Sequence, residues 1–97
     1  MKFEVVKLTR FRKNLKKMLR RGKDIRKLEA VVSMLARGEP LPAKYKDHAL
    51  TGDLAGLRDC HIENDWLLLY YIEDNVLVLT LTDTGTHSDL FLQPASH

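Results

Sequence analysis

The sequence is short of cysteine, proline and glycine and has no long apolar run, and each shortage excludes something. Its 97 residues include a single cysteine, Cys60, so no internal disulfide can form and a cysteine-based zinc site is excluded. Three prolines and five glycines leave no linker or low-complexity tract. The longest apolar run, WLLLYYI at residues 66–72, is too short to span a bilayer, and the first ten residues lack the apolar stretch of a signal peptide. We therefore predict one domain, residues 1–97, in the cytoplasm and without a membrane partner.

Positive charge is concentrated in the first third of the chain. Through Val31 there are twelve lysines and arginines and three acidic residues, whereas the remainder has four basic and ten acidic residues. A net charge of +9 followed by −6 indicates a polyanionic partner such as nucleic acid, the alternative being a solvated helix face. The cations that we assign to RNA contact are Lys13, Lys16, Lys17 and Arg20.

Two helices are predicted to follow a short strand at residues 2–7. The first, at residues 10–21, has an apolar stripe surrounded by cations and Thr9 as its expected N-cap. Asp24 is expected to cap the second helix, which ends at Gly38. The joint between the helices is short, so they should form an antiparallel hairpin.

Three strands are predicted after a long loop at residues 39–56, and ordered loops of this length tend to carry function. The strands lie at residues 57–62, 66–72 and 76–82, with short turns that favour an antiparallel meander. The middle strand is apolar on both faces and should be central. A short helix at residues 88–92 closes the chain. The predicted fold is α+β: an N-terminal helical hairpin packed on a small curved antiparallel sheet, with a short C-terminal helix.

Four residues in the second half are candidates for catalysis: His48, His61, Asp65 and His87. Three histidines and a carboxylate suit RNA cleavage, in which a base takes the proton of the 2′-hydroxyl and an acid protonates the 5′-oxygen. A single histidine is more often a surface or packing residue, and this set could also bind zinc, but no pair has helical i, i+4 spacing.

Other residues could hold the RNA substrate. Arg58 is a candidate cation for the phosphate, and Tyr45, Trp66 and Phe91 are candidates for base stacking. Trp66 and Phe91 could instead belong to the core, and Cys60 is expected to be a small buried residue.

Residues 41–72 (LPAKYKDHALTGDLAGLRDCHIENDWLLLYYI), followed by TGTHSDLF at residues 84–91, resemble the YafQ-like branch of the RelE/ParE toxin superfamily. The resemblance is looser over the helices. It implies a fold of the RelE-like microbial ribonuclease type and a toxin of a type II toxin–antitoxin pair. It also implies a ribosome-dependent endoribonuclease that cuts mRNA in the A site of the 70S ribosome without metal or cofactor. Its helices would contact ribosomal RNA, and a small, usually dimeric, DinJ-like antitoxin would inhibit it.

The resemblance also implies roles for individual residues. The family's catalytic loop histidine, strand histidine, turn aspartate and terminal histidine fall on His48, His61, Asp65 and His87. Its tryptophan and terminal aromatic residue fall on Trp66 and Phe91.

One position departs from the family pattern, because Asp83 stands where an arginine commonly precedes the TG[ST]H motif. Arg58 or a charged histidine could supply the missing cation, the enzyme could be slow, or Asp83 could turn away from the site. Two alternatives therefore remain open beside the nuclease. One is a catalytically weakened protein that binds RNA or the ribosome. The other is a gyrase poison on the same fold, which would leave the three histidines unexplained.

Overall fold

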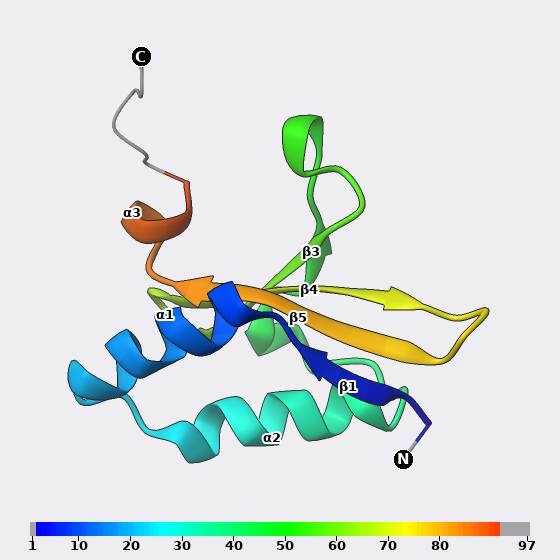
Figure 1. Cartoon of the computed structure of the whole chain (residues 1–97), viewed down its shortest axis with the longest axis horizontal. Helices are drawn as coiled ribbons and strands as arrows, with labels where there is room; N and C mark the ends of the chain where they lie inside the picture. Colours follow the sequence, from blue (N-terminus) through cyan, green and yellow to red (C-terminus); the bar gives the residue numbers. More distant parts are fainter. Residues whose placement is uncertain (1, 92–97) are drawn as a thin grey trace.

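The computed structural model describes residues 2–91, which form a five-stranded sheet with two helices packed on one face (Figure 1). This confirms the predicted α+β class and the helical hairpin. No helix within these residues is long and apolar enough to cross a membrane. The elements are β1 (Glu4–Lys7), α1 (Thr9–Arg20), α2 (Ile25–Ala36), η1 (Ala43–Tyr45), β2 (His48–Ala49), η2 (Gly52–Leu54), β3 (Arg58–Glu63), β4 (Trp66–Glu73), β5 (Val78–Gly85) and α3 (His87–Leu90).

The strand order is β1-β5-β4-β3-β2, so the predicted central position of β4 is confirmed. Strands β3, β4 and β5 pair antiparallel, as the short turns between them predicted, and β2, which lies within the predicted loop, pairs antiparallel with β3. Strand β1 pairs with β5 in parallel. The prediction of an antiparallel sheet is therefore wrong for this strand, because the distant pairing of β1 leaves no turn signal in the sequence. A β-bulge between Leu69 and Tyr70 shifts the register of β4 against β5.

The helices bury their apolar faces against one side of the sheet. Phe11 and Met18 of α1 join Leu28, Val31 and Leu35 of α2 in the core. The core also includes the side chains of β3, β4 and β5 that face the helices.

The ends of the helices agree only in part with the sequence prediction. Asp24 caps α2 as predicted, because its carboxylate accepts the backbone N–H of Arg26 at 2.9 Å. Thr9 is the first residue of α1 and not its N-cap, which is Leu8 and has no side-chain capping bond. The last helix begins at His87 and ends at Leu90, so the predicted Leu92 terminus lies outside the described residues.

The first five residues of β4, residues 66–70, are buried on both faces of the sheet. Trp66, Leu68 and Tyr70 belong to the core under the helices. Leu67 and Leu69 point to the opposite face, as successive strand residues must, and are 0% and 5% exposed. We call this second face of the sheet the open face, and Leu67 and Leu69 form its apolar floor.

A half-buried polar cluster anchors the long loop to the sheet. Asp47 accepts hydrogen bonds from the Arg58 guanidinium, with both nitrogens at 3.2 Å, and from the Tyr70 hydroxyl. Burial, with the neighbouring Asp47 carboxylate, raises the pKa of Tyr70, so its hydroxyl remains a donor. Asp47 is followed directly by His48, so the cluster positions that histidine at the sheet edge.

Removing the Tyr70 hydroxyl should loosen this anchor. Because a hydrogen bond to a charged group contributes about 1.5–3 kcal/mol, we expect Tyr70→Phe to lower the free energy of unfolding by that amount in urea denaturation. Tyr71→Phe is the matched control, since no side-chain hydrogen bond of Tyr71 occurs within residues 2–91. Equal stability of the two variants would contradict the anchoring role.

Candidate active site

Two of the predicted histidines lie together at the end of the sheet where β3 turns into β4 and β5 leads into α3. His61 comes from β3 and pairs across the strand with Leu67 of the floor. His87 is the first residue of α3, which follows β5 directly. The two imidazole rings lie edge to face with their centroids 5.4 Å apart. The Phe91 ring lies 6.3 Å from the His87 ring, so the structure places three of the predicted residues side by side.

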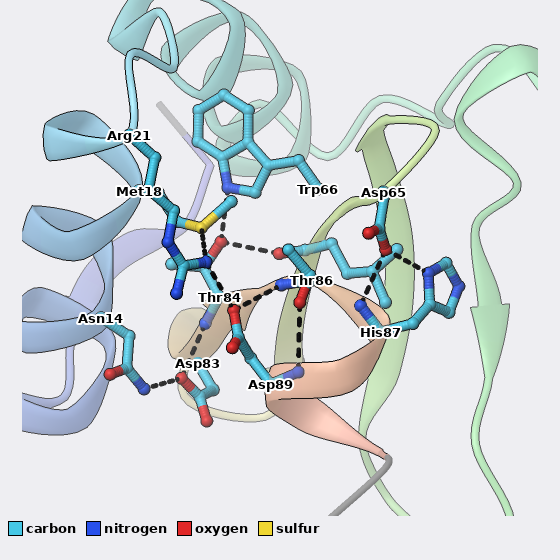
Figure 2. Close-up of polar contacts among 11 residues, drawn as sticks. Asn14, Met18, Arg21, Asp65, Trp66, Asp83, Thr84, Thr86, His87 and Asp89 are labelled. Carbon is cyan, nitrogen blue, oxygen red and sulfur yellow. Dashed lines mark hydrogen bonds and ion pairs between the residues drawn. The ribbon is translucent and has the colours of Figure 1, made fainter.

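Asp65 holds His87 in one orientation (Figure 2). Its Oδ1 accepts both the backbone N–H of His87 at 2.8 Å and the ring Nδ1 at 2.6 Å. The backbone bond and then the ring bond lower the pKa of Asp65, so it is ionised at neutral pH. An ionised carboxylate only accepts hydrogen bonds, so Nδ1 carries a hydrogen and Nε2 is left to exchange a proton with a substrate.

His48 reaches the site from the edge strand β2. Its Nδ1 lies 2.7 Å from the backbone carbonyl of Lys46. Lys46 adopts a left-handed backbone with φ +51°, a conformation that is costly for a residue other than glycine. This geometry turns the carbonyl toward the imidazole, so the loop fixes the ring and leaves Nε2 facing the sheet.

A carboxylate that the sequence analysis missed lies among these histidines. Asp59 is the residue of β3 paired with His48 across the strands, and it shares the open face with His61. It is 3% exposed, and its Oδ2 is 3.7 Å from His48 Nε2. The only available signal was its alternation with His61, two residues along a predicted strand.

A groove runs from His61 toward the long loop and α2. It has a volume of about 590 Å³, and its walls include Tyr45 of η1 together with Lys44 and Lys46. The Lys44 ammonium lies 5.1 Å from the centre of the Tyr45 ring. Tyr45 is half-buried, so one part of the ring packs on the core and the rest lines the groove.

The predicted stacking role of Trp66 is wrong. The side chain is 0% exposed, and its Nε1 donates to Thr84 Oγ1 at 2.9 Å inside the core. Strand alternation places Trp66 under the helices, on the face opposite the floor residue Leu67. The sequence could not show this, because every residue from Trp66 to Tyr70 is apolar and either face could be the open one.

The position of Arg58 also does not fit its predicted role as the cation that faces the phosphate. Arg58 points to the helix side of the sheet, where Asp47 holds it, whereas Asp59 and His61 point to the open face. The hydrogen bond from Asp47 raises the pKa of Arg58 and fixes the side chain there. Arg58 therefore does not face the histidine rings.

Asp83 is turned away from the histidines toward α1 (Figure 2). Its Oδ1 accepts from Asn14 Nδ2 at 2.7 Å and from the backbone N–H of Thr84 at 2.8 Å, and Arg10 lies 3.8 Å from its other oxygen. The carboxylate is 8% exposed and is thus part of the contact between β5 and α1.

The four cations predicted to contact RNA are all exposed on α1. None of them forms an ion pair or side-chain hydrogen bond within residues 2–91. Lys17 also lines a second groove of about 450 Å³, between α1, η2 and α3. The other three predicted RNA-contacting cations of α1 are Lys13, Lys16 and Arg20.

Within the described chain, no group of three or more His, Cys, Asp and Glu side chains is arranged to hold a metal ion. Cys60 is buried at 0% exposure, and burial raises the pKa of its thiol, so it is a packing residue as expected.

The sequence and fold are similar to those of known proteins. The family described as bacterial toxin of type II toxin-antitoxin system, YafQ, matches residues 3–92. The mRNA interferase toxin YafQ of Escherichia coli strain K12 is 43% identical over 82 residues, which are 84% of this chain and 87% of the relative. The E. coli DinJ-YafQ toxin-antitoxin complex contains a chain with 38% identity and a TM-score of 0.84, covering 94% of this chain and 99% of that one. A metal-bound toxin from Helicobacter pylori is 40% identical with a TM-score of 0.86, covering 92% and 99%.

The helical hairpin on a mixed sheet, with paired histidines where the last strand meets α3, defines a type II toxin of the RelE-like group. Within that group the match extends over nearly the whole chain. The protein belongs to the YafQ family of toxins.

The reassignment of Trp66 can be tested with Trp66→Phe, which keeps an aromatic ring but loses the bond to Thr84. We expect the free energy of unfolding to fall by about 1–3 kcal/mol in urea denaturation. Affinity for a single-stranded RNA should stay unchanged at a temperature where both proteins are folded. A weaker RNA complex with unchanged stability would restore the stacking role.

Proposed function

We propose that this protein is a ribosome-dependent endoribonuclease that cuts mRNA in the ribosomal A site, in the cytoplasm, under the control of an antitoxin. The observation that carries the proposal is the Asp65–His87 pair with His61 beside it, on the open face of a YafQ-family fold. The curated relative from E. coli is named an mRNA interferase, which supports the same reaction here.

The cleavage uses the RNA's own 2′-hydroxyl. One imidazole takes the proton of that hydroxyl, the oxygen attacks phosphorus in line, and the bond from phosphorus to the 5′-oxygen breaks. A second imidazole, in its protonated form, gives a proton to the departing 5′-oxygen. Each transfer contributes about 10²–10⁴-fold. His61 and His87 are close enough to act on opposite sides of one phosphate, and Asp65 holds His87 Nε2 toward it.

RNA binding extends away from these rings. Phe91 and Tyr45 stack bases, because Phe91 lies beside His87, Tyr45 lines the same groove as His61, and unpaired bases stack on aromatic side chains. Lys13, Lys16, Lys17 and Arg20 contact ribosomal RNA phosphates, and this is supported by their exposure and lack of internal partners. Binding should therefore weaken as salt rises.

The proposed inhibitor is a DinJ-like antitoxin, usually a dimer, that covers the site or the basic surface of α1. The support is the toxin-antitoxin complex of the E. coli relative. An acidic segment of the antitoxin would be complementary to the cationic first third of this chain.

The proposal predicts that His87→Ala abolishes cleavage while the fold survives. We expect discrete cuts by wild-type protein on a defined message in a bacterial cell-free translation system, read by primer extension, and a loss of at least about 10²-fold in the variant. Chelation with EDTA of the toxin before its addition should leave the cuts unchanged, because the chemistry uses side chains alone. Undiminished cleavage by His87→Ala would overturn the mechanism, and loss after chelation would overturn its independence of metal.

A second candidate function rests on Asp83. Asp83 occupies the position of a common family arginine, so the site has one positive charge less than the family pattern. Its carboxylate accepts a hydrogen bond from Asn14. A lost preorganised donor costs about 2.7–4 kcal/mol of transition-state stabilisation. The protein would then bind RNA or the ribosome and cleave slowly.

Under this alternative, Asp83→Arg should create or raise cleavage by about 10²–10³-fold over wild type in the same assay. The substitution leaves Asn14 without its acceptor and puts a cation near Arg10, so Arg10→Gln/Asp83→Arg is the better-matched variant. Arg10→Gln alone is the control. Full activity of wild-type protein, with no gain in either arginine variant, would exclude the weakened enzyme.

A further inference from the structure

Asp59 has an environment that its role in the fold does not explain. Its Oδ1 is buried and makes no hydrogen bond within the described chain, and its Oδ2 approaches only His48 Nε2, at 3.7 Å. Buried carboxylates are normally paired or bonded, since desolvation without a partner is costly. An unsatisfied carboxylate beside His48, on the same face of β3 as His61, therefore points to a role in the chemistry of the histidines.

The groups around Asp59 come from every neighbouring element. His48 faces it from β2, His61 lies two residues along β3, and His87 of α3 lies beside His61. Asp47, just before β2, adds a negative charge, and β4 contributes the apolar Leu69 directly opposite. Burial raises the pKa of Asp59, while the three histidines act in the opposite direction.

The hydrogen bonds of His48 determine where a proton is needed. The carbonyl of Lys46 only accepts, so Nδ1 of His48 carries a hydrogen. In a neutral ring Nε2 would then present a lone pair to the carboxylate of Asp59, and the two would repel. One proton between Nε2 and Oδ2 removes this conflict, whichever atom holds it.

We propose that Asp59 is a positioning residue which shares one proton with His48, so that a positively charged His48 can face the RNA phosphate. The charged ring presents local positive charge to the phosphate, which offsets part of the loss of the cation that is missing at position 83. When the phosphate arrives, the proton lies on His48 Nε2 and the negative Asp59 stays behind it. The pair carries no net charge, so it does not repel RNA. This inference rests on the proposed nuclease function.

The proton sharing can be tested on the free protein by NMR. The side-chain carboxyl carbon of Asp59 should titrate above the usual aspartate range in wild type, and higher still in His48→Gln, which removes the positive partner. At pH 7, Asp59→Asn should shift the His48 Nε2 resonance to that of an unprotonated nitrogen. Asp74→Asn is the matched control, since it removes the same charge from an exposed turn far from α3 (Figure 1). Identical Asp59 titration in wild type and His48→Gln would overturn the proposal.

Cleavage provides the second readout. Asp59→Asn should cut about 10²-fold more slowly than wild type and Asp74→Asn. The alkaline limb of its pH–rate profile should move to lower pH, because the proton on His48 is held less firmly. Its resistance to urea should not fall, since a desolvated charge has been removed. Marked destabilisation, or an unchanged rate and profile, would overturn the role of Asp59. Absence of cleavage by wild type would instead refute the nuclease, and the NMR titration would still decide the proton sharing.

Discussion

The site depends on the burial of β4 on both of its faces. On one face its side chains complete the core with the two helices, and on the other Leu67 and Leu69 make a dry floor. Asp59 and His61 stand directly beside that floor through the pairing of β3 with β4. Because water is excluded there, a carboxylate can remain desolvated and the charges of the histidines act on it strongly. A polar residue at Leu69 would hydrate the same position and remove that effect.

Local patterns in the sequence predicted most of the scaffold. The apolar stripes and Asp24 identified the helices, and the turns after β3 and β4 identified the meander. Features that depend on distant parts of the chain were not predictable. The parallel pairing of β1 with β5 leaves no signal of its own, and an entirely apolar β4 does not reveal which side faces the helices. That ambiguity is the reason why Trp66 was assigned to the RNA and not to the core.

The sequence motif proposes four site residues by type and order, but it does not show which partners hold them. Asp65 and His87 are 22 positions apart and meet only because the sheet and α3 bring the ends together. Arg58 and Asp59 are neighbours in sequence, yet one points to the helices and the other to the histidines. A cation was therefore expected where the structure has a carboxylate.

Three carboxylates near the site show how the environment determines the role of one residue type. Asp65 is exposed, accepts two bonds from His87 and is held ionised by them. Asp83 is buried and serves the contact with α1 through Asn14. Asp59 is buried and makes no hydrogen bond within residues 2–91, and burial raises its pKa. Asp65 thus orients a ring, Asp83 joins a helix to the sheet and Asp59 holds a proton. The number of hydrogen-bond donors around each carboxylate, and its access to water, determine which of these roles it has. By this reasoning a histidine held in its charged form by a buried carboxylate can present positive charge to the phosphate without an arginine at position 83, although the pair itself has no net charge.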